Sequence, residues 1–322
     1  MAQKKLNQKI GDQGSERRSL RAALHHLFFG RSELLRVFWL WVLGFAVYFA
    51  WTWGVERLFG LIFGRLHLHA MNLAYGDVIQ APLWATMFIE GYDPLLSIVE
   101  SLGMALIFYY IAKHSQTRTY HSHFDVPRMF RWAALGLAVG LGGSLLCVLT
   151  DSMRLALPLS EPDFSWSVAI ALPMCFLSTL AGEIFMMDYL YDAARARMHR
   201  IPCILLLIVV EFVAEGGWHL SWIGMLNVML QILVCCLLHE QFGLAAPTGL
   251  FFGWSFALSA LTVNVSYGAR GGLWSLYNVS EPWLTGGSHG IFDGVIMTAL
   301  LLGVVAFLYL RSRRGQGTHP EP

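Results

Sequence analysis

Residues 167–200 read SVAIALPMCFLSTLAGEIFMMDYLYDAARARMHR, and residues 201–222 continue with IPCILLLIVVEFVAEGGWHLSW. Both stretches are apolar enough for a lipid bilayer, yet they carry carboxylates and a histidine deep within them: Glu183, Glu211, Glu215 and His219. A charged side chain at mid-bilayer costs about 2.5–3.5 kcal/mol on insertion scales, so such groups usually face a protein interior or a wet cavity. The two stretches therefore predict neighbouring membrane helices whose polar side chains share a cavity.

The whole chain has the composition of a polytopic membrane protein. Of its 322 residues, 56% are hydrophobic and only 13% are charged, whereas a soluble domain carries about 25% charged residues. Apolar runs of about 20 residues mark candidate spans, and we predict an all-α fold with about eight transmembrane helices. The runs are centred on Val37–Val55, Pro94–Ala112, Trp132–Leu149, Ser165–Tyr191, Ile201–Leu220, Ile223–Leu238, Pro247–Val265 and Ile291–Leu310. Charged residues and Pro82 interrupt the stretch Leu58–Trp84, where we expect an outer or interfacial segment.

Loop charges predict the orientation of these spans. The N-terminal tail and the segments Lys113–Arg131, Arg195–Arg200 and Arg311–Arg314 are basic, whereas the loop Asp151–Asp163 is acidic on balance. Because cytoplasmic loops are enriched in Lys and Arg, eight spans place both termini in the cytoplasm. We expect an integral protein of a bacterial inner membrane.

The same features divide the chain into four parts. The first is a basic cytoplasmic tail whose sequence RRSLRAALHHLFF predicts an amphipathic helix on the membrane surface. N-terminal transmembrane helices, a transmembrane core and a second cytoplasmic tail follow. The expected boundaries are 1–30, 31–164, 165–311 and 312–322.

Small residues indicate how the helices pack. Two GxxxG patterns, Gly136–Gly140 and Gly249–Gly253, predict helices that approach closely. The five cysteines all lie in apolar segments without metal-ligand spacing, and we expect them to pack as small apolar residues. No basic patch with interleaved aromatic residues occurs, so nucleic acid is not an expected partner.

Three of the polar residues follow helical spacing. Glu211, Glu215 and His219 are four residues apart, and four residues advance an α-helix by about 400°, so the three form one stripe roughly 12 Å long. Glu183 lies about as far before the turn at Arg197–Arg200 as Glu215 lies after it. We therefore expect Glu183, Glu215 and His219 to meet between two antiparallel helices.

Such a cluster suits acid–base chemistry. A carboxylate near a second one can act as a general base or acid, and a neighbouring histidine can orient water, hold an oxyanion or bind a metal. No HExxH sequence is present, so a metal cofactor is allowed but not required. In the alternatives without a chemical role, Glu211 only forms a hydrogen bond to a neighbouring helix, and His219 is an interfacial residue.

Four segments of the second half carry a family resemblance. Gly182–Leu190 reads GEIFMMDYL, and His219 follows Glu215 by four residues. Phe242-Gly243-Leu244-Ala245 precedes Phe251 and Ser255, and Leu284–Gly294 reads LTGGSHGIFDG. Together, from Ser165 to the C-terminus, these segments resemble the CAAX-processing and bacteriocin-processing (CPBP) family of intramembrane proteases. In that family the first segment holds two glutamates and an arginine, the second a histidine, and the third a histidine and an asparagine.

The resemblance assigns roles to several positions. Glu183 stands at the second glutamate, with Gly182 in place of the first and Met187 in place of the arginine. A register shifted by one would make Glu183 the first glutamate and put Asp188 at the arginine position. Phe251 replaces the second histidine, and Ser255 replaces the asparagine.

The activity that the resemblance implies is hydrolysis of a peptide bond inside the membrane, with a peptide or membrane-protein tail as substrate. The expected catalytic residues are Glu183, Glu215 and His219, and the expected auxiliary residues are Glu211, Ser255, His289 and Asp293. Three alternatives stay open. One is a non-catalytic scaffold or immunity-type relative, because motif residues are replaced. The others are an ion-coupled transporter, because carboxylates line a span, and a rhomboid-like serine protease using Ser255 or Ser288.

Overall fold

The computed structural model describes residues 33–75, 82–114, 124–156, 166–214, 221–264, 272–279, 282–286 and 291–316. Helices dominate these residues, and each of the eight predicted spans overlaps one of them. They are α2 (Glu33–Tyr75), α3 (Leu83–His114), α4 (Val126–Leu149), α5 (Trp166–Glu183), η1 (Ile184–Tyr191), α6 (Asp192–Arg195), α7 (Arg200–Ala214), α8 (Trp222–Phe242), α9 (Ala245–Phe256), η3 (Ala257–Leu261), α10 (Pro282–Thr285), η6 (Ile291–Asp293) and α11 (Val295–Gln316).

Five of the helical segments are long and apolar enough to cross a membrane. They are Val37–Leu73, Leu83–His114, Val126–Leu149, Val168–Arg195 and Trp222–Phe242. Two further apolar helices, Ala245–Leu261 and Val295–Arg311, are shorter. The prediction of an all-α, polytopic membrane protein is thereby confirmed.

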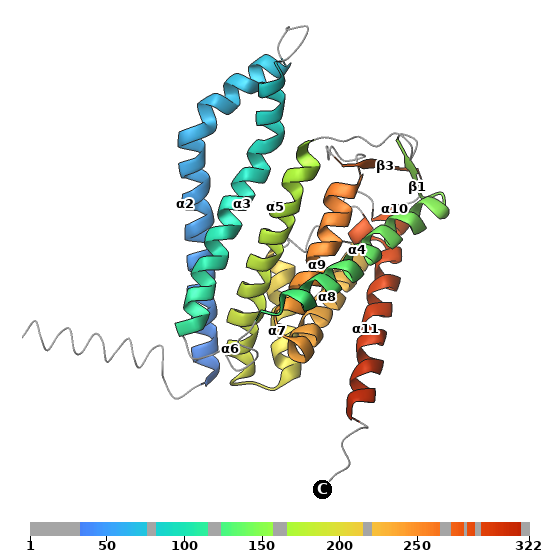
Figure 1. Ribbon diagram of the computed structural model, residues 1–322. Helices are drawn as coiled ribbons and strands as arrows, with labels where there is room; N and C mark the ends of the chain where they lie inside the picture. The colour runs from blue at the N-terminus through green and yellow to red at the C-terminus, as the bar shows by residue number, and fades with distance from the viewer. Residues whose placement is uncertain are drawn as a thin grey trace, which may run out of the picture.

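Helices α2 and α3 form a hairpin that is longer than the other helices and extends past their ends (Figure 1). Helix α2 has 43 residues, or roughly 64 Å at about 1.5 Å per residue, well above the hydrocarbon thickness of about 30 Å. The stretch expected to be outer or interfacial is helical as far as Tyr75. Proline first interrupts the chain at Pro82, directly before α3 begins.

Two glycine patterns hold α4 and α9 together. A Cβ atom at Gly136 would overlap the Leu250 carbonyl oxygen, and one at Gly253 would overlap the Ala133 carbonyl oxygen. Glycine therefore lets the two backbones touch, as the GxxxG spacing predicts. Figure 1 shows α4 crossing obliquely over α9 and α8.

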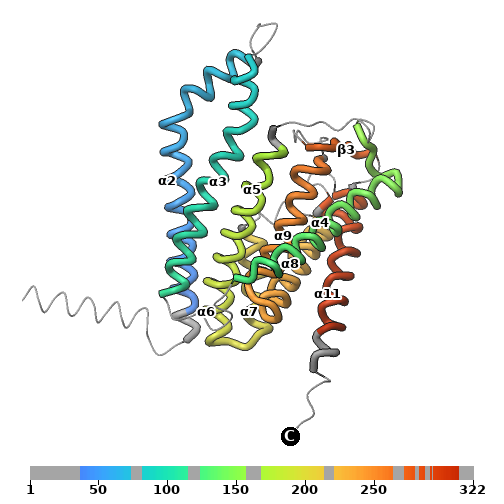
Figure 2. Tube along the Cα trace, in the orientation of Figure 1, coloured from blue at the N-terminus to red at the C-terminus, as the bar shows by residue number. Residues whose placement is uncertain are grey.

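A small sheet covers one end of the helices. Two of its strands lie in predicted loops, and the third lies at the end of the predicted span Pro247–Val265. β1 (Met153–Leu155) pairs antiparallel with β3 (Trp274–Asn278), and β3 pairs parallel with β2 (Thr262–Asn264). The strands follow α4 and η3, so they lie together at what we name the sheet end (Figure 2). Strands of three to five residues carry too little periodicity to be recognised in a sequence.

The opposite end of the bundle is basic, and we name it the basic end. It contains the start of α4, the turn from α6 to α7 and the end of α11 (Figure 1). Its cationic side chains include Arg128, Arg131, Arg195, Arg197, Arg200 and Arg311. The loop-charge rule predicts that this end faces the cytoplasm.

Candidate functional site

Glu183 is the last residue of α5 and directly precedes the π-helix η1. Its side chain is buried, with 7% of its surface exposed. The thiol of Cys235 on α8 donates a hydrogen bond to Glu183 Oε1 at 3.3 Å. The other oxygen, Oε2, has no hydrogen-bond partner among the described residues. A π-helix often accompanies functional sites.

A second carboxylate lies close to Glu183. Glu211 on α7 is near enough for its charge to act on Glu183. It lines a cavity of about 270 Å³ between α7, α8 and α9. The polar residues of this cavity are Glu211, Gln231, Ser255 and Ser259, and the larger apolar ones include Phe251 and Trp254.

The cavity lies in the middle of the bundle. Glu183, Glu211, Gln231 and Ser255 each stand roughly 15–18 Å along their helices from the basic end, at about 1.5 Å per residue. They come from four different helices, α5, α7, α8 and α9. The carboxylates within the apolar stretches of the sequence predict a polar-lined space at this position in the bundle.

The structure brings together some of the predicted site residues. Glu183 and Glu211 lie within electrostatic range of each other, and Ser255 shares the Glu211 cavity with Phe251. Glu215, His219 and His289 lie outside the described residues, as does Ser288.

Asp293 lies elsewhere, at the sheet end. Its carboxylate accepts hydrogen bonds from Ser221 Oγ at 2.7 Å and from the Ser221 backbone N–H at 3.4 Å. Ser221 in turn caps α8 by accepting a hydrogen bond from the Gly224 N–H at 3.1 Å. This contact links the starts of α8 and α11.

The replaced motif positions differ in their surroundings. Gly182 is exposed, and an added Cβ there would meet nothing within 4 Å. Met187 is fully buried in the core. Gly182 therefore lies on the exposed face of α5, whereas Met187 lies in the packed core.

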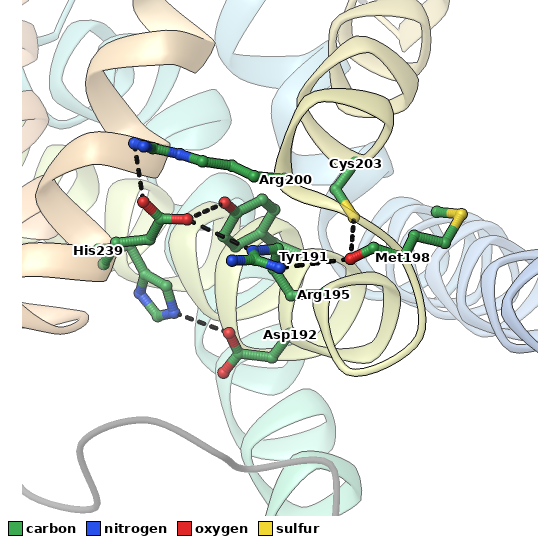
Figure 3. A network of polar contacts seen from close by, with 8 residues as sticks. Tyr191, Asp192, Arg195, Met198, Arg200, Cys203 and His239 are labelled. Carbon is green, nitrogen blue, oxygen red and sulfur yellow. Dashed lines mark hydrogen bonds and ion pairs between the residues drawn. The ribbon is translucent and has the colours of Figure 1, made fainter.

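A second polar cluster, which we name the Asp–His cluster, lies toward the basic end. It consists of Asp188, Asp192 and His239, all buried and at most 4% exposed. His239 Nε2 and Asp192 Oδ1 are 3.1 Å apart, and Figure 3 shows the two side chains pointing toward each other. One ligand atom from each of the three residues lies within 4.8 Å of the others, so the cluster could hold a metal ion.

Next to this cluster, Glu240 ties the turn between α6 and α7 to α8. Its Oε1 accepts a hydrogen bond from the Tyr191 hydroxyl at 2.6 Å and pairs with Arg195 Nε at 3.5 Å. Its Oε2 pairs with Arg200 at 2.8 Å. Figure 3 shows Tyr191, Arg195 and Arg200 gathered around one carboxylate.

Sequence reasoning missed the Asp–His cluster and Cys235. A signal for the first was available, because Asp188 and Asp192 are four residues apart in an apolar run and share one face of a helix. His239 lies near the end of its span and resembles an interfacial residue. Cys235 carried no such signal, since a cysteine in an apolar helix is usually a packing residue.

Comparison of the chain with protein-family models, with curated proteins and with solved structures finds no match. The fold and the apolar helices define the class: an integral, polytopic membrane protein of α-helices.

Proposed function

We propose that this protein is an intramembrane hydrolase that cleaves a peptide bond in a peptide or a membrane-protein tail. The observation that carries the proposal is a buried carboxylate, Glu183, within electrostatic range of Glu211, which lines a polar cavity in the middle of the helix bundle. A carboxylate desolvated beside a second one is suited to exchange protons with water near neutral pH.

Hydrolysis requires two transfers of one proton, first from water to a carboxylate and then from that carboxyl group to the leaving amine. A carboxylate of the pair removes a proton from water while the water oxygen attacks the scissile carbonyl carbon. The resulting tetrahedral oxyanion needs a hydrogen-bond donor, and the Gln231 amide and the Ser255 hydroxyl line the same cavity. The protonated carboxyl then returns its proton to the leaving amine, the C–N bond breaks, and the two carboxylates regain their starting states.

The resemblance to intramembrane proteases supports the same location. Phe251 and Ser255, which stand where the family has a histidine and an asparagine, both line the Glu211 cavity. Glu183 stands at a family glutamate and lies beside that cavity's carboxylate. His219 keeps its predicted role of positioning water or the oxyanion.

The test is a comparison of membrane-protein termini in cells that express the protein. Wild type is expected to produce new termini that disappear with Glu183→Gln, Glu211→Gln and His219→Ala. The matched control is Glu90→Gln, because Glu90 is an exposed glutamate on α3. Termini that persist in both Glu183→Gln and His219→Ala, at normal protein levels, would reject the proposal.

An ion-coupled transporter is the second candidate, and one observation favours it. The charges of Glu211, Asp188 and His239 all act on Glu183. Titratable groups thus run from the Glu211 cavity to a second cavity of about 230 Å³ that Asp192 and His239 line. Chains of this kind relay protons in pumps and transporters. Proton flux into proteoliposomes that His239→Gln abolishes would favour this candidate, and no flux above empty vesicles would exclude it.

A further inference from the structure

We propose that Asp188, Asp192 and His239 bind one divalent transition-metal ion. Asp188 lies in η1, Asp192 begins α6, and His239 belongs to the last turn of α8. One ligand atom from each lies within 4.8 Å of the others. The three residues come from two neighbouring helical segments, so helix packing already brings the ligand set together.

One ligand atom of the Asp–His cluster, Asp192 Oδ2, is available for an ion on the side where His239 turns its Nε2 toward Asp192. Asp192 Oδ2 and His239 Nδ1 are buried and have no hydrogen-bond partner among the described residues. Both side chains are only 1% exposed. Buried polar atoms without partners are uncommon and costly, and coordination of an ion would satisfy Asp192 Oδ2.

Charge also favours an ion at this place. Two carboxylates carry two negative charges into a buried setting, where uncompensated charge is expensive. A divalent cation neutralises both while the imidazole binds in its neutral form. The arginines Arg195 and Arg200 do not fill this role, because both pair with Glu240.

The ligand types indicate the class of ion. Imidazole with carboxylates suits Zn²⁺, Mn²⁺ or Fe²⁺ rather than Ca²⁺ or a soft monovalent ion. Three protein ligands leave coordination positions open. The cavity of about 230 Å³ lined by Asp192 and His239 offers an entry path and space for water.

The experiment uses full-length protein, purified in detergent, stripped with a chelator and dialysed against Zn²⁺. Elemental analysis should find one Zn²⁺ per chain, and Zn²⁺ should raise the unfolding temperature. Asp192→Asn and His239→Gln should each weaken binding by at least the roughly 10–100-fold that loss of an outer-shell partner costs. The matched controls Asp151→Asn and His114→Gln, both of exposed residues, should bind as wild type does.

Two results would overturn the metal site. One is a wild-type protein that binds less than one ion per chain with each of Zn²⁺, Mn²⁺ and Fe²⁺. The other is unchanged binding in the Asp192→Asn/His239→Gln double variant. Thermal unfolding of the stripped variants shows whether they fold, so lost binding is separated from lost structure. The result is independent of the proposed hydrolysis, which depends on Glu183 and Glu211.

A separate observation assigns a second site, for the phosphate of an anionic phospholipid. A cavity of about 210 Å³ at the basic end is lined by three arginines and by four large apolar residues. They are Arg128, Arg131, Arg311, Trp132, Leu135, Phe242 and Phe307. Basic pockets between transmembrane helices bind lipid headgroups in this way.

The arginines of this cavity are held in place by their neighbours. Arg128 Nη1 donates to the Phe242 carbonyl at 2.8 Å, and its Nη2 pairs with Asp125 at 3.2 Å. The Arg311 guanidinium lies 4.9 Å from the centroid of the Phe242 ring. Guanidinium groups fixed beside apolar side chains suit a phosphodiester with its acyl chains, and we commit to a lipid as its source.

Native mass spectrometry with phosphatidylglycerol and phosphatidylcholine tests this lipid site. Wild type should retain phosphatidylglycerol in preference, and Arg131→Gln/Arg311→Gln should lose that preference. The control Arg197→Gln removes a charge from the same end and should keep it. Equal retention of the two lipids by wild type, or full competition by soluble glycerol 3-phosphate at equal concentration, would overturn the assignment.

Discussion

The thiol of Cys235 donates a hydrogen bond to Glu183 Oε1 across the interface of α5 and α8, at a donor–acceptor distance of 3.3 Å. Both residues are buried, at 4% and 7% exposure. The contact fixes one oxygen of the carboxylate, and the other, Oε2, is buried without a hydrogen-bond partner among the described residues. It makes Cys235 a positioning residue for the proposed base.

Replacing this donor should destabilise the protein. In Cys235→Ala the carboxylate loses its donor, and a buried acceptor left unsatisfied costs about 1–3 kcal/mol. Cys235→Ser keeps a donor and should lose less. Thermal unfolding in detergent checks the order, with Cys147→Ala as a control that removes a buried thiol from the core of α4. Equal losses in all three variants would contradict the role of this hydrogen bond.

The crossing of α4 and α9 depends on glycine at the contact. Gly253→Ala forces a Cβ against the Ala133 carbonyl oxygen, and overpacking of this kind costs about 1–3 kcal/mol. Gly142→Ala, on the partner helix α4 and with nothing within 4 Å of its Cβ, should leave stability unchanged. Unfolding in mixed micelles measures both variants, and a Gly253→Ala protein as stable as Gly142→Ala would disprove the close approach.

A buried amide joins α8 to α11. Asn227 is fully buried, accepts a hydrogen bond from the Thr298 hydroxyl at 2.7 Å and donates one to the Gly294 carbonyl at 3.2 Å. Hydrogen bonds between membrane helices have coupling energies of about 0.6 kcal/mol, with a maximum near 1.7. A double-mutant cycle of Asn227→Ala and Thr298→Val should give a coupling in this range. A coupling of zero would mean that the two side chains do not interact.

Glu240 should control access to the turn between α6 and α7. Its carboxylate pairs with Arg195 and Arg200 on the two sides of that turn, and hydrogen bonds to charged groups contribute about 1.5–3 kcal/mol. Glu240→Gln weakens both pairs, so trypsin should cut near Arg197 at least about five-fold faster. The rate of limited proteolysis checks this, with Glu90→Gln as the control. A cleavage rate equal to that of wild type would contradict the role of Glu240.

Much of the fold follows from the chain's apolar runs, because each membrane helix must satisfy its own backbone hydrogen bonds. The glycine spacing in α4 and α9 also predicted close packing. The α2–α3 hairpin was only partly foreseen: charged residues such as Arg65 suggested an interruption where the helix continues to Tyr75. Charge lowers apolar character without breaking a helix, and the first proline of the chain, Pro82, directly precedes α3.

The candidate site was predictable only in part. Glu183 and Glu211 were recognisable because carboxylates in apolar spans are costly. The contacts of Glu183 with Cys235, and of Asp192 with His239, join residues about 50 positions apart. Such pairs depend on how α5, η1 and α8 rotate against each other. The π-helical turn after Glu183 changes that rotation, and helical spacing alone does not reveal it.

Cleavage kinetics of the Glu183 and Glu211 variants test the central claim most directly. The substrate is a peptide spanning a cleavage site found by the analysis of termini, presented with purified protein in lipid nanodiscs. If the two carboxylates act as one catalytic unit, Glu183→Gln and Glu211→Gln each lower kcat/KM by about 100-fold or more, and the double variant is little worse than the slower single variant. A wild-type kcat/KM in either single variant would contradict the account.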